Sequence, residues 1–218
     1  MFGDGALTFR EFAMGETLPL ATIHDAVLDF LRGREDAVVC GPQAVNGYVD
    51  DDRYTCDFDV LSTRAGDLAD EIRVCMRGRF DIAIDVVEAS SGKAFDLVQR
   101  RVIAVPRFVR VRSVVALPPA RWIEEILVII PEELTAERVV ACYRHRRTPT
   151  EGTDVRDIAV LLLKFPALQR EVGPVRDRLE ASITEGISPG VRDLWLQIVQ
   201  RRFEPDDPEA KFFAPIAR

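Results

Sequence analysis

Hydrophobic residues recur with two different periods along the chain, and the change of period divides the sequence. In the first half, short runs of β-branched and other apolar residues predict strands, and amphipathic stretches between them predict helices. We expect helices over residues 20–31, 42–48 and 63–77, and strands over 37–40, 56–61, 80–88, 94–103 and 108–115. The first half is therefore predicted to be an α/β unit with a sheet of about five strands, a common size.

Pro118 and Pro119 interrupt this pattern, and the apolar spacing after them becomes helical. Apart from a short apolar run over 126–130, we expect helices over residues 132–146, 153–165, 174–183 and 189–203. The predicted domains are an α/β core over residues 1–117 and a C-terminal helical domain over 118–218. The expected fold class is α+β, with a mixed sheet, flanking helices and a following helical bundle.

Composition narrows the class of protein. The 218 residues carry 29 Lys+Arg and 36 Asp+Glu, a net charge of −7, and 47% of them are hydrophobic, as in ordinary globular proteins. The apolar runs fall far short of the ~20 residues that span a bilayer, so no membrane segment is expected. Because the N-terminus has no basic stretch before an apolar one, the cytoplasm is the expected location. The acidic balance disfavours a broad basic surface for nucleic acid but leaves room for a local basic groove.

Cysteine, histidine and tryptophan offer little chemistry of their own. The cysteines are scattered without a CxxC pair, which favours buried thiols over a zinc site: Cys40, Cys56, Cys75 and Cys142. His24 is expected on the polar side of its helix, and two histidines make a His-based metal site or catalytic triad implausible. Trp122 and Trp195 are expected in the core.

Two carboxylates carry the first candidate chemistry. Asp57 and Asp59 alternate with apolar residues on a predicted strand, so both side chains point to one face, about 6.5 Å apart along the chain. This spacing allows both to reach a divalent ion, as two-metal phosphoryl chemistry requires. A solvated strand face gives the same pattern, so the pair alone leaves both interpretations open.

The surrounding residues make a composite motif. Residues 39–46 read Val-Cys-Gly-Pro-Gln-Ala-Val-Asn, and residues 53–59 read Arg-Tyr-Thr-Cys-Asp-Phe-Asp. A strand ending in Gly41, a short helix and an Arg-x-Thr-x-Asp-x-Asp strand resemble the nucleotidyltransferase fold of the polymerase β type. The chain is most similar to the AbiEii/AbiGii toxin family, including the MenT-type toxins that add nucleotides to tRNA. Residues 134–141 and 153–162 resemble two later helices of that family.

The resemblance implies a set of roles. Asp57 and Asp59 would bind Mg²⁺ (or Mn²⁺), and Asp85 is the first choice for a third catalytic carboxylate, with Asp81 as a weaker option. The residues that it implies for nucleotide binding are Gly41, Gln43, Arg53, Thr55, Arg138, Asp154 and Asp157. The implied partners are an NTP, tRNA as the acceptor through its 3′ end, and a cognate antitoxin protein; a protein hydroxyl is the other acceptor.

Departures from the family pattern keep a second function open. Pro42 stands where the family has Gly or Ser and offers neither an N–H nor a hydroxyl. Arg110 stands on the later strand where an acid is expected. These features motivate the alternative of a catalytically degraded nucleotidyltransferase module that binds a nucleotide or a partner; a metal-dependent nuclease is a more distant option.

Structural roles also remain open for the helical candidates. Asp154 and Asp157 could serve the start of a helix behind Thr153, where acids are favoured anyway. The stem of Arg138 could cover apolar surface. The arginines gather in residues 100–112 and 138–147, which predicts an acidic body with a basic rim around the carboxylates.

Overall fold

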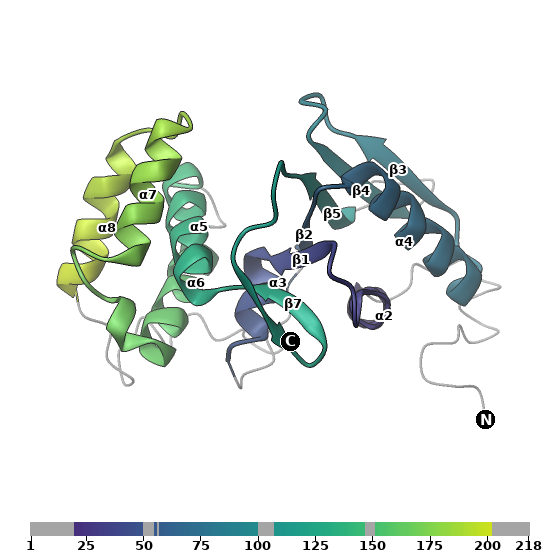
Figure 1. Cartoon of the computed structure of the whole chain (residues 1–218), viewed down its shortest axis with the longest axis horizontal. Helices are drawn as coiled ribbons and strands as arrows, with labels where there is room; N and C mark the ends of the chain where they lie inside the picture. Colours follow the sequence, from purple (N-terminus) through teal and green to yellow (C-terminus); the bar gives the residue numbers. More distant parts are fainter. Residues whose placement is uncertain (1–19, 50–54, 56, 100–106, 147–150, 202–218) are drawn as a thin grey trace. The chain divides into compact units, whose positions relative to one another are not determined.

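The computed structural model describes residues 20–49, 55, 57–99, 107–146 and 151–201. They form two compact units (Figure 1). The first unit contains the described residues of 20–43 and 55–128, and the second contains those of 44–49 and 129–201. The first unit thus extends about ten residues beyond the predicted boundary after residue 117, because the last strand pairs with the first.

The elements up to residue 129 are α2 (Leu20–Leu31), β1 (Ala37–Cys40), α3 (Gly41–Asn46), β2 (Asp59–Ser62), α4 (Ala65–Phe80), β3 (Ile84–Glu88), β4 (Ala94–Gln99), β5 (Arg107–Ser113), β6 (Ala120–Ile123) and β7 (Ile126–Ile129). They build a mixed seven-stranded sheet of order β3-β4-β5-β2-β1-β7-β6. The pairs β1/β2, β3/β4 and β4/β5 are antiparallel, whereas β2/β5 and β1/β7 are parallel. The α+β class is as expected, with β6 and β7 in addition to the five predicted strands.

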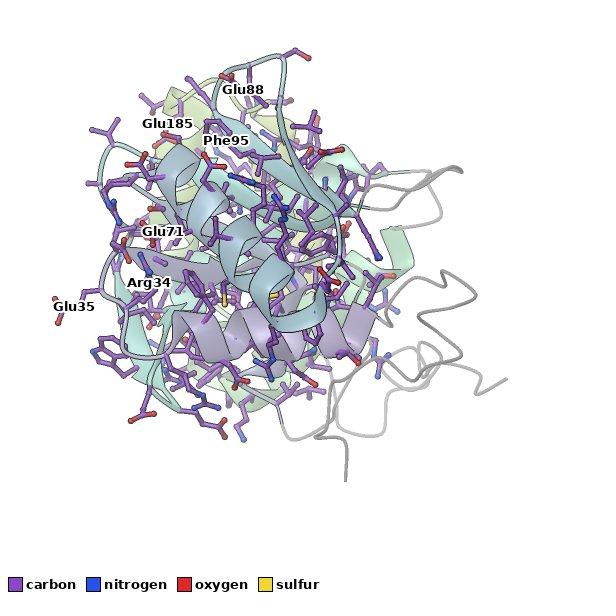
Figure 2. All side chains as sticks on the ribbon, turned by 90° about the vertical axis from the view of Figure 1, so that its right-hand side faces the viewer. Arg34, Glu35, Glu71, Glu88, Phe95 and Glu185 are labelled. Atoms are coloured by element: carbon purple, nitrogen blue, oxygen red, sulfur yellow. The ribbon has the colours of Figure 1, made fainter. Side chains whose placement is uncertain are left out.

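Helices α2 and α4 pack on one face of this sheet and against each other (Figure 2). The buried residues of α4 recur at helical spacing, with Leu68, Ile72 and Met76 among them. Phe80 continues this stripe, so the helix runs past Gly78 and includes Phe80, which we assigned to the start of a strand. It ends where Asp81 adopts a left-handed conformation with φ of 52°.

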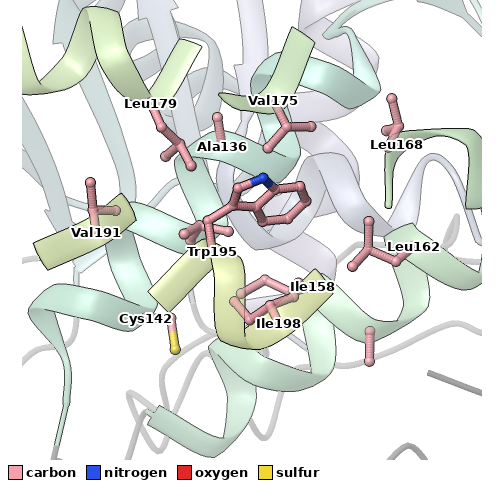
Figure 3. Packing of buried hydrophobic residues seen from close by; sticks show 12 residues of the cluster. Ala136, Cys142, Ile158, Leu162, Leu168, Val175, Leu179, Val191, Trp195 and Ile198 are labelled. Carbon is pink, nitrogen blue, oxygen red and sulfur yellow. The ribbon is translucent and has the colours of Figure 1, made fainter. Parts of the chain in front are cut away.

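The second unit is helical: α5 (Pro131–Arg144), α6 (Glu151–Lys164), the short 3₁₀ helix η1 (Pro166–Leu168), α7 (Pro174–Thr184) and α8 (Gly190–Arg201). Trp195 lies at the centre of its apolar core with no exposed surface (Figure 3). Its indole Nε1 donates to the carbonyl of Arg170 at 3.2 Å, so the polar atom of the buried ring is satisfied.

Of three expectations about single residues, one is confirmed and two are wrong. Trp195 is buried as expected, but Trp122 is 48% exposed because it lies on β6, the edge strand of the sheet. His24 is buried rather than on a polar helix face. Of the helices that the structure describes, none is long and apolar enough to span a membrane.

Candidate active site

A row of polar side chains crosses the middle of the sheet. Cys40 on β1 is opposite Asp59 on β2, Asp59 is opposite Arg110 on β5, and Arg110 is opposite Asp96 on β4. Directly opposed residues on paired strands point to the same face. Phe95 contacts Gly66 of α4 and so marks the helix-covered face, which places its neighbour Asp96 and the whole row on the other one. We call this side of the first unit the polar face.

Asp59 lies against the turn that follows β1. Gly41 has a φ of +67°, and a Cβ atom added to it would lie 2.9 Å from the Oδ2 atom of Asp59. Both the backbone conformation and the close carboxylate therefore require glycine here. The structure brings together two residues that the sequence motif singled out, Gly41 and Asp59.

Asp57 lies two residues before Asp59, just ahead of β2, and its side chain is exposed. The Thr55 hydroxyl donates to the backbone carbonyl of Asp57 at 3.1 Å and accepts from its N–H at 3.2 Å. Thr55 thus shapes the backbone that presents Asp57. Arg107, at the start of β5, donates from Nη2 to Oδ1 of Asp57 at 2.8 Å.

Arg110 lies next to Asp59, at the place on the later strand where the resemblance implies an acid and the sequence shows an arginine. Arg110 donates from Nε and Nη2 to the two carboxylate oxygens of Asp96, at 2.6 and 2.7 Å. This hydrogen bonding to Asp96 raises the pKa of Arg110, and the negative charge of Asp59 acts in the same direction. Arg110 is therefore a fixed positive charge between two carboxylates.

The sheet order does not bring Asp85 to this place. Asp85 is on β3, the edge strand, and β4 and β5 lie between β3 and β2, a separation of roughly 14 Å at the usual strand spacing. Asp81 caps the end of α4. Asp96 is the acid that sequence reasoning missed: Phe95-Asp96-Leu97 has the same apolar-Asp-apolar pattern as Ile84-Asp85-Val86, and only strand order distinguishes the two.

Arg112 extends the positive charge across the sheet. Its Nη2 donates to the Sγ atom of Cys40 at 2.9 Å, although β2 lies between β5 and β1. The guanidinium consequently passes over β2 next to the row that contains Asp59. Within the described residues, the polar face thus combines the carboxylates of Asp57, Asp59 and Asp96 with the guanidinium groups of Arg107, Arg110 and Arg112.

His24 supports the site from the opposite, helix-covered face. Its ring centroid lies 5.2 Å from that of Phe58, the residue between the two motif aspartates, and its Nε2 lies 2.9 Å from the carbonyl oxygen of Phe108. Burial lowers the pKa of His24, so the neutral ring with a proton on Nε2 suits this hydrogen bond. The side chain of His24 therefore contacts residues at or next to the starts of β2 and β5.

The helical candidates meet in the second unit. Arg138 of α5 and Asp154 and Asp157 of α6 are all buried, and Nη1 of Arg138 lies 3.6 Å from Oδ1 of Asp154 and 3.9 Å from Oδ2 of Asp157. His145 Nδ1 lies 2.7 Å from Oδ2 of Asp154. Because α6 begins at Glu151, Thr153 lies inside the helix rather than before it, but Asp154 is still in the first turn, where the helix dipole favours an acid. Because Arg138, Asp154 and Asp157 are buried, each of these charges needs the opposite charge beside it.

For two other residues predicted to bind the nucleotide, the structure gives little information. Gln43 is half-buried on α3, and Arg53 lies outside the described residues. Among the described residues, no group of three or more His, Cys, Asp or Glu side chains could hold a metal ion. Any divalent ion on the polar face would therefore need ligands from outside this set of side chains.

Comparison with solved structures identifies the fold. The chain is similar to the Megavirus polyadenylate synthase, with a TM-score of 0.52 and 16% identity over 72% of this chain and 34% of that one. It is also similar to JHP933 from Helicobacter pylori, with a TM-score of 0.50 and 11% identity over 94% and 92% of the two chains. The chain spans about a third of the length of the polyadenylate synthase.

A weaker similarity, with a TM-score of 0.39 and 17% identity, relates 74% of the chain to 84% of an antigenic nucleotidyltransferase-like protein from Paracoccidioides brasiliensis. No protein-family model matches the sequence, and no curated protein matches it significantly. The chain therefore has the nucleotidyltransferase fold. Membership of the AbiEii/AbiGii family stays a prediction.

Proposed function

We propose that this protein transfers a nucleoside monophosphate from an NTP to an acceptor and releases pyrophosphate. The observation that carries the proposal is the position of Asp59. Its carboxylate lies against the Gly41 turn, with Asp57 two residues before it, on a sheet with the nucleotidyltransferase fold. Two carboxylates beside a glycine turn suit an NTP held by its phosphates together with a divalent ion.

Asp57 and Asp59 would hold Mg²⁺ or Mn²⁺. Their hard oxygen atoms fit a magnesium ion, which binds proteins through one or two carboxylates and completes its shell with substrate phosphates and water. Such a site needs no third protein ligand, consistent with the side chains of the polar face. When bound, the ion would neutralise charge that develops on the phosphoryl oxygens.

The protein's own residues would bind and orient the substrate. Arg110 lies opposite Asp59, and Arg112 reaches across β2 to Cys40, so both place positive charge near Asp59, where the phosphates would lie. Gly41 is proposed to bind a phosphate through its backbone, Gln43 could replace the contact that Pro42 cannot make, and Thr55 fixes the backbone of Asp57. Arg53 is proposed as a further phosphate contact.

Arg138, Asp154 and Asp157 are proposed as nucleotide-binding residues of the second unit. Their mutual burial equally supports a structural role. Replacing Arg138 separates the two roles. Loss of nucleotide affinity with an unchanged unfolding temperature indicates binding, whereas a lower unfolding temperature indicates structure.

For the acceptor, we propose the 3′ end of tRNA, with the protein acting as a toxin that a cognate antitoxin neutralises. The resemblance of the sequence blocks supports this, as do Arg144 and Arg146, which are exposed at the end of α5 and suited to phosphate contacts. A protein hydroxyl is the other acceptor that the test must include.

The test is incubation of the full chain with Mg²⁺, each labelled NTP in turn, total tRNA and a protein extract. We expect label in RNA with the wild type and none with Asp57→Asn/Asp59→Asn. Label in protein instead of RNA would show that the acceptor is a protein hydroxyl, and the proposed transfer reaction would stand. Equal labelling by the wild type and the double variant would refute the enzymatic proposal.

One observation favours a second function, a degraded module that binds without chemistry. Arg110 occupies the position opposite Asp59 and is bound to Asp96 through both carboxylate oxygens, so the strand next to β2 offers no free carboxylate there. Calorimetric titration with NTP and Mg²⁺ separates the functions, since binding without labelled product supports the degraded module.

A further inference from the structure

Arg107 lies between two carboxylates of the polar face. Its Nη2 donates to Oδ1 of Asp57 at 2.8 Å, and its Nε is 3.9 Å from Oδ1 of Asp96. Asp96 already accepts two short hydrogen bonds from Arg110. The close partner of Arg107 is therefore Asp57, one of the two carboxylates proposed to bind the divalent ion.

This ion pair is accessible to solvent. The side chain of Arg107 is 27% exposed and that of Asp57 is 54% exposed. Exposed pairs stabilise a protein by only about 0.2–1 kcal/mol, so another cation can displace the guanidinium at low cost. By contrast, Arg110 has two contacts to one carboxylate and should stay in place.

We propose that Arg107 takes the place of the metal on Asp57 in the free protein and binds the triphosphate once a divalent cation occupies Asp57. This inference rests on the proposed function, since it assumes an NTP on the polar face. The planar guanidinium suits both positions, because its fork of donors matches carboxylate and phosphate oxygens equally well. Arg107 is then a substrate-binding residue that pairs with Asp57 in the free protein.

The consequence is coupling between metal and nucleotide. A cation binding alone must compete with Arg107 for Asp57, and a nucleotide binding alone meets an arginine that is already paired. When both bind, the cation releases Arg107 and the phosphates receive it. Each ligand therefore strengthens the other by the same factor, as thermodynamic linkage requires.

The test compares Arg107→Ala with the wild type in two titrations of the full chain. For Mn²⁺ alone, followed by electron paramagnetic resonance, we expect the variant to bind about two- to fivefold tighter, because a competing cation has gone. For ATP, GTP, CTP and UTP, each with saturating Mn²⁺, we expect the nucleotide that binds best to lose about tenfold or more in affinity, as for a charged hydrogen bond.

Two further variants serve as controls. Arg73→Ala removes an arginine paired with Asp70 at 2.9 Å on α4, which makes the same change in net charge, and should leave both affinities unchanged. Arg107→Lys keeps the charge but loses the fork, so its Mn²⁺ affinity without nucleotide should stay near that of the wild type. Thermal unfolding of each variant checks the fold.

Opposite changes in the two affinities cannot result from damage to the fold, which would weaken both. Unchanged or weaker Mn²⁺ binding by Arg107→Ala overturns the inference, and so does unchanged nucleotide affinity. Failure of the wild type to bind any of the four nucleotides overturns it as well. The coupling is measured without turnover, so a protein that binds in this way but transfers nothing would retain the inference and lose only the proposed reaction.

Discussion

Gly41 shows how the backbone of one residue positions the carboxylate of Asp59. Its φ of +67° turns the chain from β1 into α3, and the missing side chain leaves the space that the Asp59 carboxylate uses. Few other residues adopt this conformation without strain. The sequence order Cys40-Gly41-Pro42 is thus tied to the position of an acid nearly twenty residues later.

Replacing Gly41 by alanine should affect both stability and the site. The left-handed conformation costs a residue with a Cβ atom about 1–2 kcal/mol, and the new methyl group would displace Asp59. We expect Gly41→Ala to lower the free energy of unfolding in urea by about this amount and to reduce NTP transfer or binding at least tenfold.

Gly78→Ala is the matched control. Gly78 lies within α4, its φ is not positive, and an added Cβ atom would meet nothing within 4 Å. We expect this variant to be more stable by about 0.5–1 kcal/mol, because alanine favours a helix. If both variants lowered stability equally, the argument for the left-handed turn would be wrong.

Asp36 shows how local charge sets the acid sensitivity of the first unit. Hydrogen bonds from Arg34, and then from Arg64, lower the pKa of Asp36 to about 2. Arg34 also lies 2.8 Å from Glu71 of α4 (Figure 2). The network links the segment before β1 to α4.

The lowered pKa predicts a pH window. Because Asp36 binds its proton less readily in the folded state, its contribution to stability is present above about pH 4 and is lost as the pH falls towards 2. Asp36→Asn should cost about 1 kcal/mol at pH 7, allowing for solvent screening. Chemical unfolding should show the difference from the wild type shrinking between about pH 4 and pH 2; a constant difference would contradict the assignment.

At the scale of elements, the β6–β7 hairpin has an unusual turn. Glu124 and Glu125 both have positive φ, 46° and 66°, where asparagine and glycine are preferred in two-residue hairpin turns. The end of α2 holds the turn: Gly33 N–H donates to the carbonyl of Glu125 at 2.8 Å, and Arg32 donates to that of Glu124 at 2.6 Å. Contacts distant in sequence thus support a turn with no local signal.

Giving this turn its preferred residues should stabilise the protein. We expect Glu124→Asn/Glu125→Gly to raise the free energy of unfolding by about 1 kcal/mol, since the new residues adopt positive φ at less cost. Glu124→Gln/Glu125→Gln removes the same charges and keeps the backbone cost, so it should stay within about 0.5 kcal/mol of the wild type. If both variants gained the same free energy of unfolding, the cause would be the removal of charge and not the backbone conformation.

For the whole molecule, local arrangement of charge matters more than net charge. The chain carries −7 overall, yet the polar face sets three arginines against three acids among the described residues. Arg107, Arg110 and Arg112, from one of the two arginine blocks, lie among these carboxylates, whereas the predicted basic rim that includes residues 138–147 stays a prediction. The negative body therefore says little about whether this face can accept the phosphates of a nucleotide.

Ligand binding should be visible in the stability of the whole chain. A ligand at about 100 times its Kd adds about 2.7 kcal/mol to the stability of the state that binds it, which for a chain of this size raises Tm by roughly 5–10 °C. We expect this shift with NTP and Mg²⁺ together and a much smaller one with either alone. Adding EDTA, or using Asp57→Asn/Asp59→Asn, should remove it, and a shift that survives both would contradict binding at this site.

Prediction from sequence succeeded where the signal was local. The helices of the second unit begin and end within two residues of their expected bounds, because each has an apolar period and a proline or charged residue at its start or just before it. A motif of about twenty residues singled out Gly41 and Asp59, which lie against each other in the structure, and their binding roles stay a prediction. Phe80 was misplaced because a helix end and a strand start share apolar residues. Trp122 was misplaced because burial depends on which strand lies at the edge.

By itself, the sequence determined the period of each segment, the glycine turn after β1 and the alternation of Asp59 with buried apolar residues, whereas Asp57 lies ahead of the strand on which we expected it. These depend on residues near one another in the chain, where backbone sterics and side-chain spacing act directly. Only the tertiary structure decided the strand order, and with it that Arg110 lies beside Asp59, that Asp96 lies opposite Arg110 on the next strand, and that Asp85 lies at the edge of the sheet. Strand order depends on pairing between segments that are distant in sequence. The strands that contain Asp85 and Asp96 have the same apolar-Asp-apolar pattern, so the local sequence does not distinguish them.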